Sequence, residues 1–261
     1  NFFPKFRLES RKQKEKRTDY TVGLTRAMEL FFKTYVEACL QKPRSYNILG
    51  CCADEYLIEN DIKEIQRTLS EMFDYHCRMS YPLNTSLREI RFAAEAEFNI
   101  VLRQEALPAA IWMKERFNIP YVFSDCYGIQ EMKKLLKEVS EVIRVSPRCA
   151  QLDSVNALSA HDKEKHVLIL GNQNSANGLL RCLTEELEMH NVYAMAFSTT
   201  THNKSIQPYK EEILEKQMRD TGPDILIGNS ILFDFPGHAP SIDIPLLKPV
   251  GIAMKTPRPH Y

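Results

Sequence analysis

The chain has 261 residues and a formal net charge of zero, so no global charge favours binding to nucleic acid or to an anionic membrane. The hydrophobic content of 44% and the charged content of 26% are typical of a globular protein, and the length suits two α/β domains or one large one. No apolar run approaches the roughly 18 residues of a membrane span, and no signal peptide is recognised. Seven cysteines without regular spacing predict free thiols in a reducing cytoplasm rather than a disulfide framework.

The first 43 residues are predicted to be a linker followed by an amphipathic helix. Residues 5–17 form a basic, polar run, for which a solvated linker and a docking arm for another subunit are both open interpretations. In the segment 21–40, apolar residues recur at helical spacing, which predicts one buried face. Because the chain starts without Met and stops just after an expected strand, we expect it to be part of a longer protein.

A strand–helix–strand unit at residues 98–128 sets the pattern of the first domain, which is expected over 44–146. The run 98–102 is almost wholly apolar, as a parallel strand covered on both faces requires. A helix with Pro108 in its first turn follows, and 119–123 is the next strand. Further strands are expected at 45–49 and, more weakly, at 75–79, and further helices at 58–72, 86–97 and 129–142. This alternation predicts a doubly wound parallel sheet.

A second domain of the same type is expected over 166–261, after a linker at 147–165. Its first strand is the buried run 166–171, and Asn174 or Ser175 is expected to cap the helix that follows. Further strands are expected at 191–197, 224–228 and 249–254, and a charged helix at 207–220. The predicted fold class is therefore α/β, with two Rossmann-like, doubly wound parallel-sheet domains.

Candidate site residues follow from a general rule for open α/β sheets, whose ligands bind beyond the carboxyl ends of the strands. Two sheets with these ends facing each other would enclose a cleft between the domains. The residues expected to line that cleft are Cys51, Arg103, Glu105, Asp125, Asn172 and His202. For Glu105, the alternative is a first-turn acid favoured by the helix dipole, and for His202 a surface or hydrogen-bonding role.

Neither first strand is followed by a dinucleotide-binding glycine motif, and no Walker lysine loop occurs, so NAD or ATP binding by this chain is disfavoured. Cys51, Cys52 and Cys126 all follow strands of one predicted sheet. Their thiolates could hold an iron–sulfur cluster or another soft metal. The sequence contains no C-x-x-C motif, however, and adjacent cysteines are poor joint ligands for one metal, so ordinary buried thiols are the alternative.

Several stretches carry a family resemblance. They are Asn-Ile-Leu-Gly at 47–50, Ala-Glu-Phe-Asn-Ile-Val-Leu at 96–102, Lys-Glu-Arg-Phe-Asn-Ile-Pro-Tyr at 114–121, Tyr-Gly-Ile at 127–129, His-Val-Leu-Ile-Leu-Gly at 166–171 and Gly-Pro-Asp-Ile-Leu-Ile-Gly at 222–228. Together they resemble the component 1 proteins of nitrogenase and their relatives. These relatives include cofactor-assembly scaffolds, the dark-operative protochlorophyllide reductase and the enzyme that reduces a nickel tetrapyrrole. The resemblance covers about 44–255.

The resemblance implies a subunit with three Rossmann-like domains, of which this chain would hold two. A separate ATP-driven P-loop iron–sulfur protein would deliver electrons, and a cluster would relay them to a substrate or metallocofactor between the domains. The implied partners are a second copy of the chain or a related component 1 subunit. Because the cysteines of the bridging cluster lie mostly in the amino-terminal domain of such subunits, this chain is not expected to hold that cluster alone.

The sequence departs from the nitrogenase catalytic branch at one position. That branch places a metallocofactor-binding cysteine just after the strand that corresponds to 98–102, where this chain has Leu102 or Arg103. Dinitrogen reduction is therefore not expected. Arg103 and Glu105 sit where the protochlorophyllide-reductase branch carries a charged pair, which favours the tetrapyrrole-like or uncharacterised branches.

The main functional hypothesis is an oxidoreductase subunit of this type with an unidentified substrate. In it, Arg103 would bind a ligand carboxylate and Glu105 would donate a proton, while the other candidate residues would bind the cofactor or form the cleft walls. Two alternatives stay open. One is a non-catalytic scaffold of the same superfamily that binds a metallocofactor precursor, and the other is a cytoplasmic two-domain protein that binds a small ligand and signals.

Overall fold

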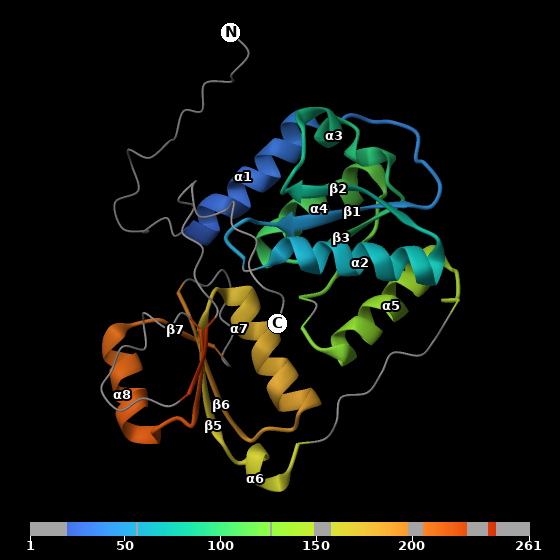
Figure 1. The fold of residues 1–261 in the computed structure, drawn as a ribbon. Helices are drawn as coiled ribbons and strands as arrows, with labels where there is room; N and C mark the ends of the chain where they lie inside the picture. Colours follow the sequence, from blue (N-terminus) through green and yellow to red (C-terminus); the bar gives the residue numbers. More distant parts are fainter. Residues whose placement is uncertain are drawn as a thin grey trace, which may run out of the picture.

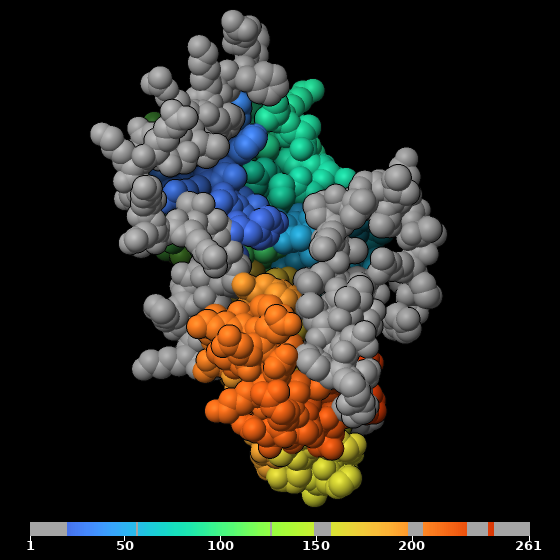
Figure 2. Space-filling model, turned by 90° about the vertical axis from the view of Figure 1, so that its left-hand side faces the viewer, coloured from blue at the N-terminus to red at the C-terminus, as the bar shows by residue number. Residues whose placement is uncertain are grey.

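The computed structural model describes residues 20–55, 57–125, 127–148, 158–197, 206–228 and 240–243. These residues form two parallel sheets, each with helices on both faces (Figure 1). We call each sheet with its covering helices a domain, and Figure 2 shows the second domain (yellow to red) below the first (blue to green). Among the described residues, no helix is both long and apolar enough to cross a membrane.

The first domain is built on four parallel strands in the order β2-β1-β3-β4. Its strands are β1 (Ser45–Cys51), β2 (His76–Pro82), β3 (Phe98–Val101) and β4 (Tyr121–Phe123). Its helices are α1 (Tyr20–Tyr35), α2 (Ile58–Phe73), α3 (Leu87–Arg91), α4 (Leu107–Phe117) and α5 (Ile129–Ile143). The apolar faces of α2 and α5 pack on one side of the sheet, and those of α1, α3 and α4 pack on the other (Figure 1).

Within the described residues, the second domain is built on five parallel strands in the order β7-β6-β5-β8-β9. Its strands are β5 (His166–Gly171), β6 (Asn191–Ala196), β7 (Ile206–Pro208), β8 (Ile225–Gly228) and β9 (Ser241–Asp243). Its helices are α6 (Ala160–Lys163), α7 (Gln173–Arg181), which continues as a π-helical turn over Cys182–Glu186, and α8 (Glu211–Thr221). The helix α7 packs on one face of the sheet and α8 on the other.

The central strands of the first sheet are buried along their whole length, which explains their apolar sequences. Two asparagines interrupt these runs at neighbouring positions of β1 and β3. The side-chain amide of Asn47 donates to Asn99 Oδ1 at 2.9 Å and to the carbonyl oxygen of Ala93 at 3.0 Å. These bonds satisfy the amide donor of Asn47 and the oxygen of Asn99, which lowers the free-energy cost of burying the pair.

The fold confirms the predicted α/β class, and several element limits differ from the prediction. The expected helix at 86–97 is α3 followed by a 3₁₀ turn at Ala93–Glu95, and the helix expected at 21–40 ends at Tyr35. The start of the expected helix at 207–220 forms the edge strand β7 instead. The expected strand at 249–254 lies outside the described residues. The predicted domain limits, 1–43, 44–146, 147–165 and 166–261, stay predictions.

The cap of α7 was also predicted wrongly. Asn172, rather than Asn174 or Ser175, caps the helix, and its Oδ1 accepts the backbone N–H groups of Asn174 and Ser175 at 2.9 Å each. The first turn of the helix contains two polar residues, Gln173 and Asn174, whose side chains are buried and bond to Gln104 of the first domain. The helix therefore begins before its first apolar residue. The apolar period alone therefore placed the helix start too late.

Candidate functional site

Each sheet, as described, contains a pair of neighbouring strands from which the following chain connections lead to opposite sides of the sheet. In the first sheet these strands are β1 and β3, and in the second β5 and β8. Doubly wound folds bind ligands between such strands, beyond their carboxyl ends. Asp54 and Glu55 follow β1, Arg103 and Glu105 follow β3, and Asn174 follows β5, so the site can be built from these loops.

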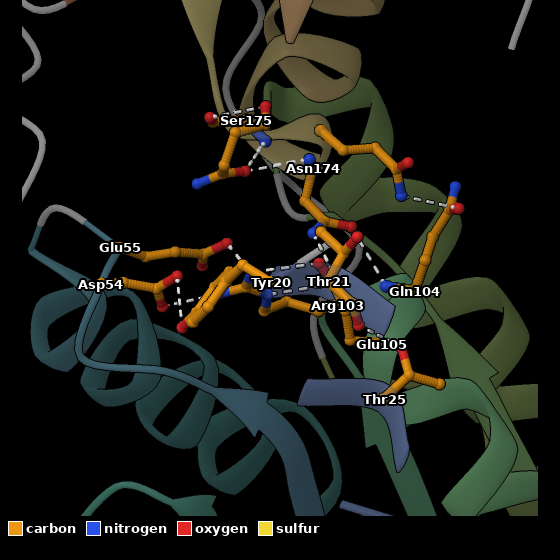
Figure 3. Close-up of polar contacts among 12 residues, drawn as sticks. Tyr20, Thr21, Thr25, Asp54, Glu55, Arg103, Gln104, Glu105, Asn174 and Ser175 are labelled. Carbon is orange, nitrogen blue, oxygen red and sulfur yellow. Dashed lines mark hydrogen bonds and ion pairs between the residues drawn. The ribbon is translucent and has the colours of Figure 1, made fainter. Parts of the chain in front are cut away.

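The two strand ends face and touch each other. The backbone N–H of Gln104 donates to Asn174 Oδ1 at 3.1 Å, and Asn174 Nδ2 donates to Glu105 Oε2 at 3.0 Å (Figure 3). Gln173 Nε2 donates to Gln104 Oε1 at 2.9 Å. The carboxyl edges of the two sheets thus lie against each other. The side chains of Arg103 and Glu105 are 1% and 0% exposed, so the edges are in direct contact there rather than separated by an open cleft.

Arg103 lies at the centre of a group of acids that we call the Arg103 cluster, consisting of Arg103, Asp54, Glu55 and Glu105. Its Nη1 contacts Asp54 Oδ1 at 2.7 Å, and its Nε is 3.7 Å from Glu55 Oε1. Its Nε and Nη2 also donate to the two oxygens of Glu105, at 3.4 and 3.2 Å. Arg103 is thus held by carboxylates of the protein itself. The binding of a ligand carboxylate by Arg103 stays a prediction. It would require at least one of these ion pairs to break.

Burial and mutual repulsion set the charges of this cluster. Burial raises the pKa of Glu55 to about 8, against the lowering effect of Arg103, and the neighbouring carboxylates of Asp54 and Glu105 raise it further. Burial alone would lower the pKa of Arg103, but Glu55 and Glu105 outweigh it and raise that pKa, so the guanidinium stays charged. Burial and the Asp54 carboxylate raise the pKa of Tyr20, whose hydroxyl donates to Asp54 at 3.1 Å, to about 12.

Gly50 allows β1 and β3 to meet at this point. It has a φ of +94°, which side-chain-bearing residues rarely adopt, and a Cβ there would lie 3.0 Å from the backbone nitrogen of Arg103. The glycine that follows the predicted first strand therefore lets the Arg103 side chain leave β3 alongside the end of β1.

Cys51, the last residue of β1, and Cys52, which follows it, lie on opposite faces of the sheet. Cys51 lies in the apolar core beneath α2 and α5, and Cys52 lies in the core beneath α1 and α4. Burial raises the pKa of Cys52 to about 12, so its thiol stays protonated at neutral pH. The two thiols therefore do not converge on one metal, and Cys126 lies outside the described residues. The cofactor-binding role of Cys51 stays a prediction, and its core position gives it no support.

A second group of charges joins the domains beyond β4. Arg181 on α7 forms ion pairs with Asp125 and, at 3.0 Å, with Glu131. The Ser124 hydroxyl also donates to Glu131, at 3.2 Å. Burial raises the pKa of Asp125 to about 6 although Arg181 acts in the opposite direction. Asp125 is therefore at the domain junction, where it pairs with the second domain, and its predicted cofactor-binding role stays a prediction.

Glu186 fixes the second domain to the start of α5. Its carboxylate accepts the backbone N–H groups of Ile129 and Gln130 at 3.1 Å each, so it caps a helix of the other domain. Gly128 precedes that helix with a φ of +89°, and a Cβ there would clash with Glu186 Oε2. The π-helical turn at Cys182–Glu186 brings this carboxylate into place.

The predicted residues thus separate into three groups. Arg103 and Glu105 pair with each other at the domain junction and Asp125 lies there in a separate ion-pair group, Asn172 caps α7 beside it, and Cys51 lies in the core. His202 lies outside the described residues. Sequence reasoning missed Tyr20 and gave no role to Asp54 or Glu55. The acidic pair directly after β1 could have been found, because the strand-end rule applies to it equally.

Comparisons with known proteins decide the family. The model of the family described as nitrogenase component 1 type oxidoreductase matches residues 15–235. The chain belongs to this family. In the part of it that the structure describes, no three His, Cys, Asp or Glu side chains form a group that could hold a metal ion.

The relatives of this nitrogenase component 1 type chain include reductase subunits. It is 27% identical over 150 residues to one subunit of the light-independent protochlorophyllide reductase of Rubrivivax gelatinosus, and the match covers 54% of this chain and 27% of that protein. It is 20% identical over 202 residues to the corresponding protein of Porphyra purpurea, covering 71% and 38%. The matched part of the chain thus spans about a quarter to two-fifths of these relatives.

A solved structure described as nitrogenase Cp1 at pH 5 has the same fold. It superposes with a TM-score of 0.58 at 15% identity, and the match covers 86% of this chain and 56% of that one. This likeness confirms the predicted Rossmann-like, nitrogenase component 1 fold.

Proposed function

We propose that this chain is a subunit of a nitrogenase-like reductase. It accepts electrons from a separate ATP-driven P-loop iron–sulfur protein and reduces a substrate held where its two domains meet. Membership of the nitrogenase component 1 type family supports the reaction class. The proposed position of the substrate is supported by the contact between Asn174 and the Gln104–Glu105 segment. This contact joins the ligand-binding edges of the two doubly wound sheets.

The substrate class that we propose is a tetrapyrrole. Relatives from several organisms are named as subunits of a light-independent protochlorophyllide reductase, and protochlorophyllide is a tetrapyrrole. Asp54 and Glu55 form the accessible rim of the Arg103 cluster, with side chains 24% and 13% exposed. A substrate at this rim would meet acidic groups first, and the buried Arg103 would be reached only if the domains part.

The described residues do not fit an iron–sulfur cluster. Cys51 and Cys52 point to opposite faces of the sheet, and the raised pKa of Cys52 opposes a thiolate. In this proposal the ligands of an electron-relaying cluster come from outside the described residues or from a partner protein. That partner would be a second copy of the chain or a related component 1 subunit. The roles that we propose for Arg103 and its acidic neighbours do not depend on where such iron–sulfur ligands lie.

The test is an anaerobic reduction assay with the full-length gene product. It is purified with its partner protein, mixed with a P-loop iron–sulfur protein, ATP and protochlorophyllide, and followed by absorbance, iron and sulfide content, and electron paramagnetic resonance. We expect ATP-dependent loss of the substrate spectrum, which a donor protein with its P-loop lysine replaced fails to support. A metal-free dimer that binds the tetrapyrrole without reducing it would overturn the proposal and favour the scaffold or sensor alternative.

A further inference from the structure

The Arg103 cluster contains more acids than its cation can balance. Among the described residues, one guanidinium faces three carboxyl groups, so the cluster would carry two excess negative charges if all three were ionised. Excess charge in a buried site is costly, and carboxyl groups that share such a site lower the cost by keeping a proton. The hydrogen bonds and the exposure of each group indicate where that proton lies.

Glu105 is held as the fixed anion. Its two oxygens accept hydrogen bonds from Arg103 Nε and Nη2 and from Asn174 Nδ2, at 3.4, 3.2 and 3.0 Å. Donors around a carboxylate favour its ionised form. The Glu105 side chain is 0% exposed, so it has no direct path for exchanging a proton with solvent or with a bound molecule.

Asp54 is also supplied with donors. It accepts from Arg103 Nη1 at 2.7 Å and from the Tyr20 hydroxyl at 3.1 Å. Both contacts stabilise its charged form.

Glu55 has the opposite surroundings. Its nearest charge contact with Arg103 is 3.7 Å, beyond hydrogen-bond distance. In the part of the chain that the structure describes, the ionisable groups that act on it are Arg103, Asp54, Glu105 and Asp61 of α2, of which only Arg103 favours its ionised form. Its side chain is 13% exposed, so its proton can reach the outside of the cluster. Burial, the largest effect, raises its pKa to about 8.

We propose that Glu55 is the proton donor of the domain junction and that Glu105 is an ionised positioning residue that holds Arg103. This assignment deepens the proposed function, on which its catalytic part rests. It also replaces the sequence-based expectation that Glu105 donates the proton.

The proton transfer conserves atoms and charge. In the proposed reduction, the substrate would gain one electron from the separate donor protein, and with it one negative charge. The O–H bond of Glu55 breaks, its hydrogen leaves as a proton, and a new bond forms between that proton and the reduced substrate atom. Glu55 becomes a carboxylate, and water returns the proton before the next transfer. The neighbouring Asp54 and Glu105 carboxylates favour this return because they disfavour a third negative charge.

The protonation state can be tested without any reaction. Infrared difference spectra of the full chain are recorded between pH 6 and pH 10 for the wild type, E55Q, E105Q and E59Q. We expect the band of a protonated carboxyl group to disappear near pH 8 in the wild type and in the E59Q control, whose glutamate is exposed on α2. E55Q should lack the band that titrates near pH 8, and E105Q should keep a band that titrates well above pH 6, where Asp125 and Asp61 already lose their protons. Persistence of the band near pH 8 in E55Q would overturn the assignment.

Unfolding free energies give a second readout. Because the pKa of Glu55 is raised on folding, the folded chain binds more protons than the unfolded one between the ordinary glutamate pKa of 4.5 and about 8. The contribution of Glu55 to stability is therefore complete below pH 4.5 and is lost as the pH rises to about 8. E55Q should flatten this part of the pH dependence, and E59Q should not. An unchanged slope in E55Q would contradict the proposal.

Activity then separates the two proposals. In the reductase assay, E55Q should lower kcat about 100-fold with little change in KM, and E55D should restore part of it. If reduction is observed and E55Q leaves kcat unchanged, the proton-donor assignment is wrong and the proposed function stands. If the infrared band belongs to Glu55 but no donor protein supports reduction, the proposed function fails and only the protonation state of Glu55 is retained.

Discussion

The side-chain amide of Asn174 donates a hydrogen bond to the buried carboxylate of Glu105, 69 residues away in the chain, with 3.0 Å between Nδ2 and Oε2. The oxygen of the same amide accepts the backbone N–H of Gln104. One side chain of the second domain thus satisfies a carboxylate and a backbone donor of the first. The orientation of Glu105 is therefore coupled to the relative position of the two domains.

Replacing Asn174 by alanine should destabilise the chain by about 2–3 kcal/mol, because a buried charged acceptor and a backbone donor both lose their partner. Urea unfolding of N174A measures this loss. The control is N191A, which removes an amide from the exposed start of β6 and should cost less than about 1 kcal/mol. Equal losses in the two variants would show that the inter-domain bonds add nothing.

Replacing Arg181 by methionine should destabilise the chain more at pH 8 than at pH 5. At pH 8 the buried carboxylates of Asp125 and Glu131 lose their cation, and we expect a cost of about 2–3 kcal/mol. Because Arg181 is 32% exposed, this is below the cost of breaking a fully buried pair. At pH 5, below the Asp125 pKa of about 6, Asp125 is mostly protonated and the cost shrinks.

The matching control for Arg181 is Arg219, which forms an exposed pair with Glu215 on α8. R219M should change the unfolding free energy by less than about 0.5 kcal/mol at both pH values. A cost for R181M that is the same at pH 5 and pH 8 would contradict the view that Asp125 titrates in this contact.

Alanine should have opposite effects at two helical glycines. A Cβ at Gly178 would clash with the ring of Tyr127, so G178A should push α7 away from the first domain and cost about 1–3 kcal/mol. A Cβ at Gly23 meets nothing within 4 Å, so G23A should stabilise α1 by about 0.5–1 kcal/mol. Thermal unfolding of both variants checks the signs. A stable G178A would indicate that Tyr127 has space to turn aside.

Removing the Glu186 carboxylate should weaken the start of α5. E186A leaves the N–H groups of Ile129 and Gln130 without their acceptor, and we expect a cost of about 1–2 kcal/mol. E186Q keeps one acceptor oxygen and should cost less. E185A is the control, because Glu185 is exposed one residue earlier. Hydrogen exchange at Ile129 and Gln130 should rise in E186A alone, and unchanged exchange would refute the cap.

Much of the fold could be predicted because its signals are local. Burial on both faces gives an uninterrupted apolar run, and burial on one face gives a helical period, and both patterns can be recognised from neighbouring residues. Examples are the strands β1, β3 and β5 and the helices α2 and α5. The short strands β7 and β9 were not predicted, because edge strands of three residues carry too few apolar positions for a period. The cap of α7 was misplaced for a similar reason.

The sequence also determined which loops belong to the candidate site. Arg103 and Glu105 follow the buried strand β3 and Asp125 follows the partly buried strand β4, and parallel strands place their carboxyl ends at one edge of a sheet. What that rule leaves open is the partner of each side chain. The tertiary structure alone decided that Arg103 faces three carboxyl groups, because Asp54 and Glu55 come from a different loop, the one that follows β1.

Charge and protonation were decided by the same long-range contacts. In the sequence, Glu105 and Glu55 are both acids after a strand, and nothing local separates their roles. In the fold, Glu105 is surrounded by donors from Arg103 and Asn174, whereas Glu55 lies at the rim of the cluster near other carboxylates. Residue types and strand order therefore determined where polar groups gather, and desolvation and charge–charge distances, which exist only in the folded chain, decided which of them holds a proton.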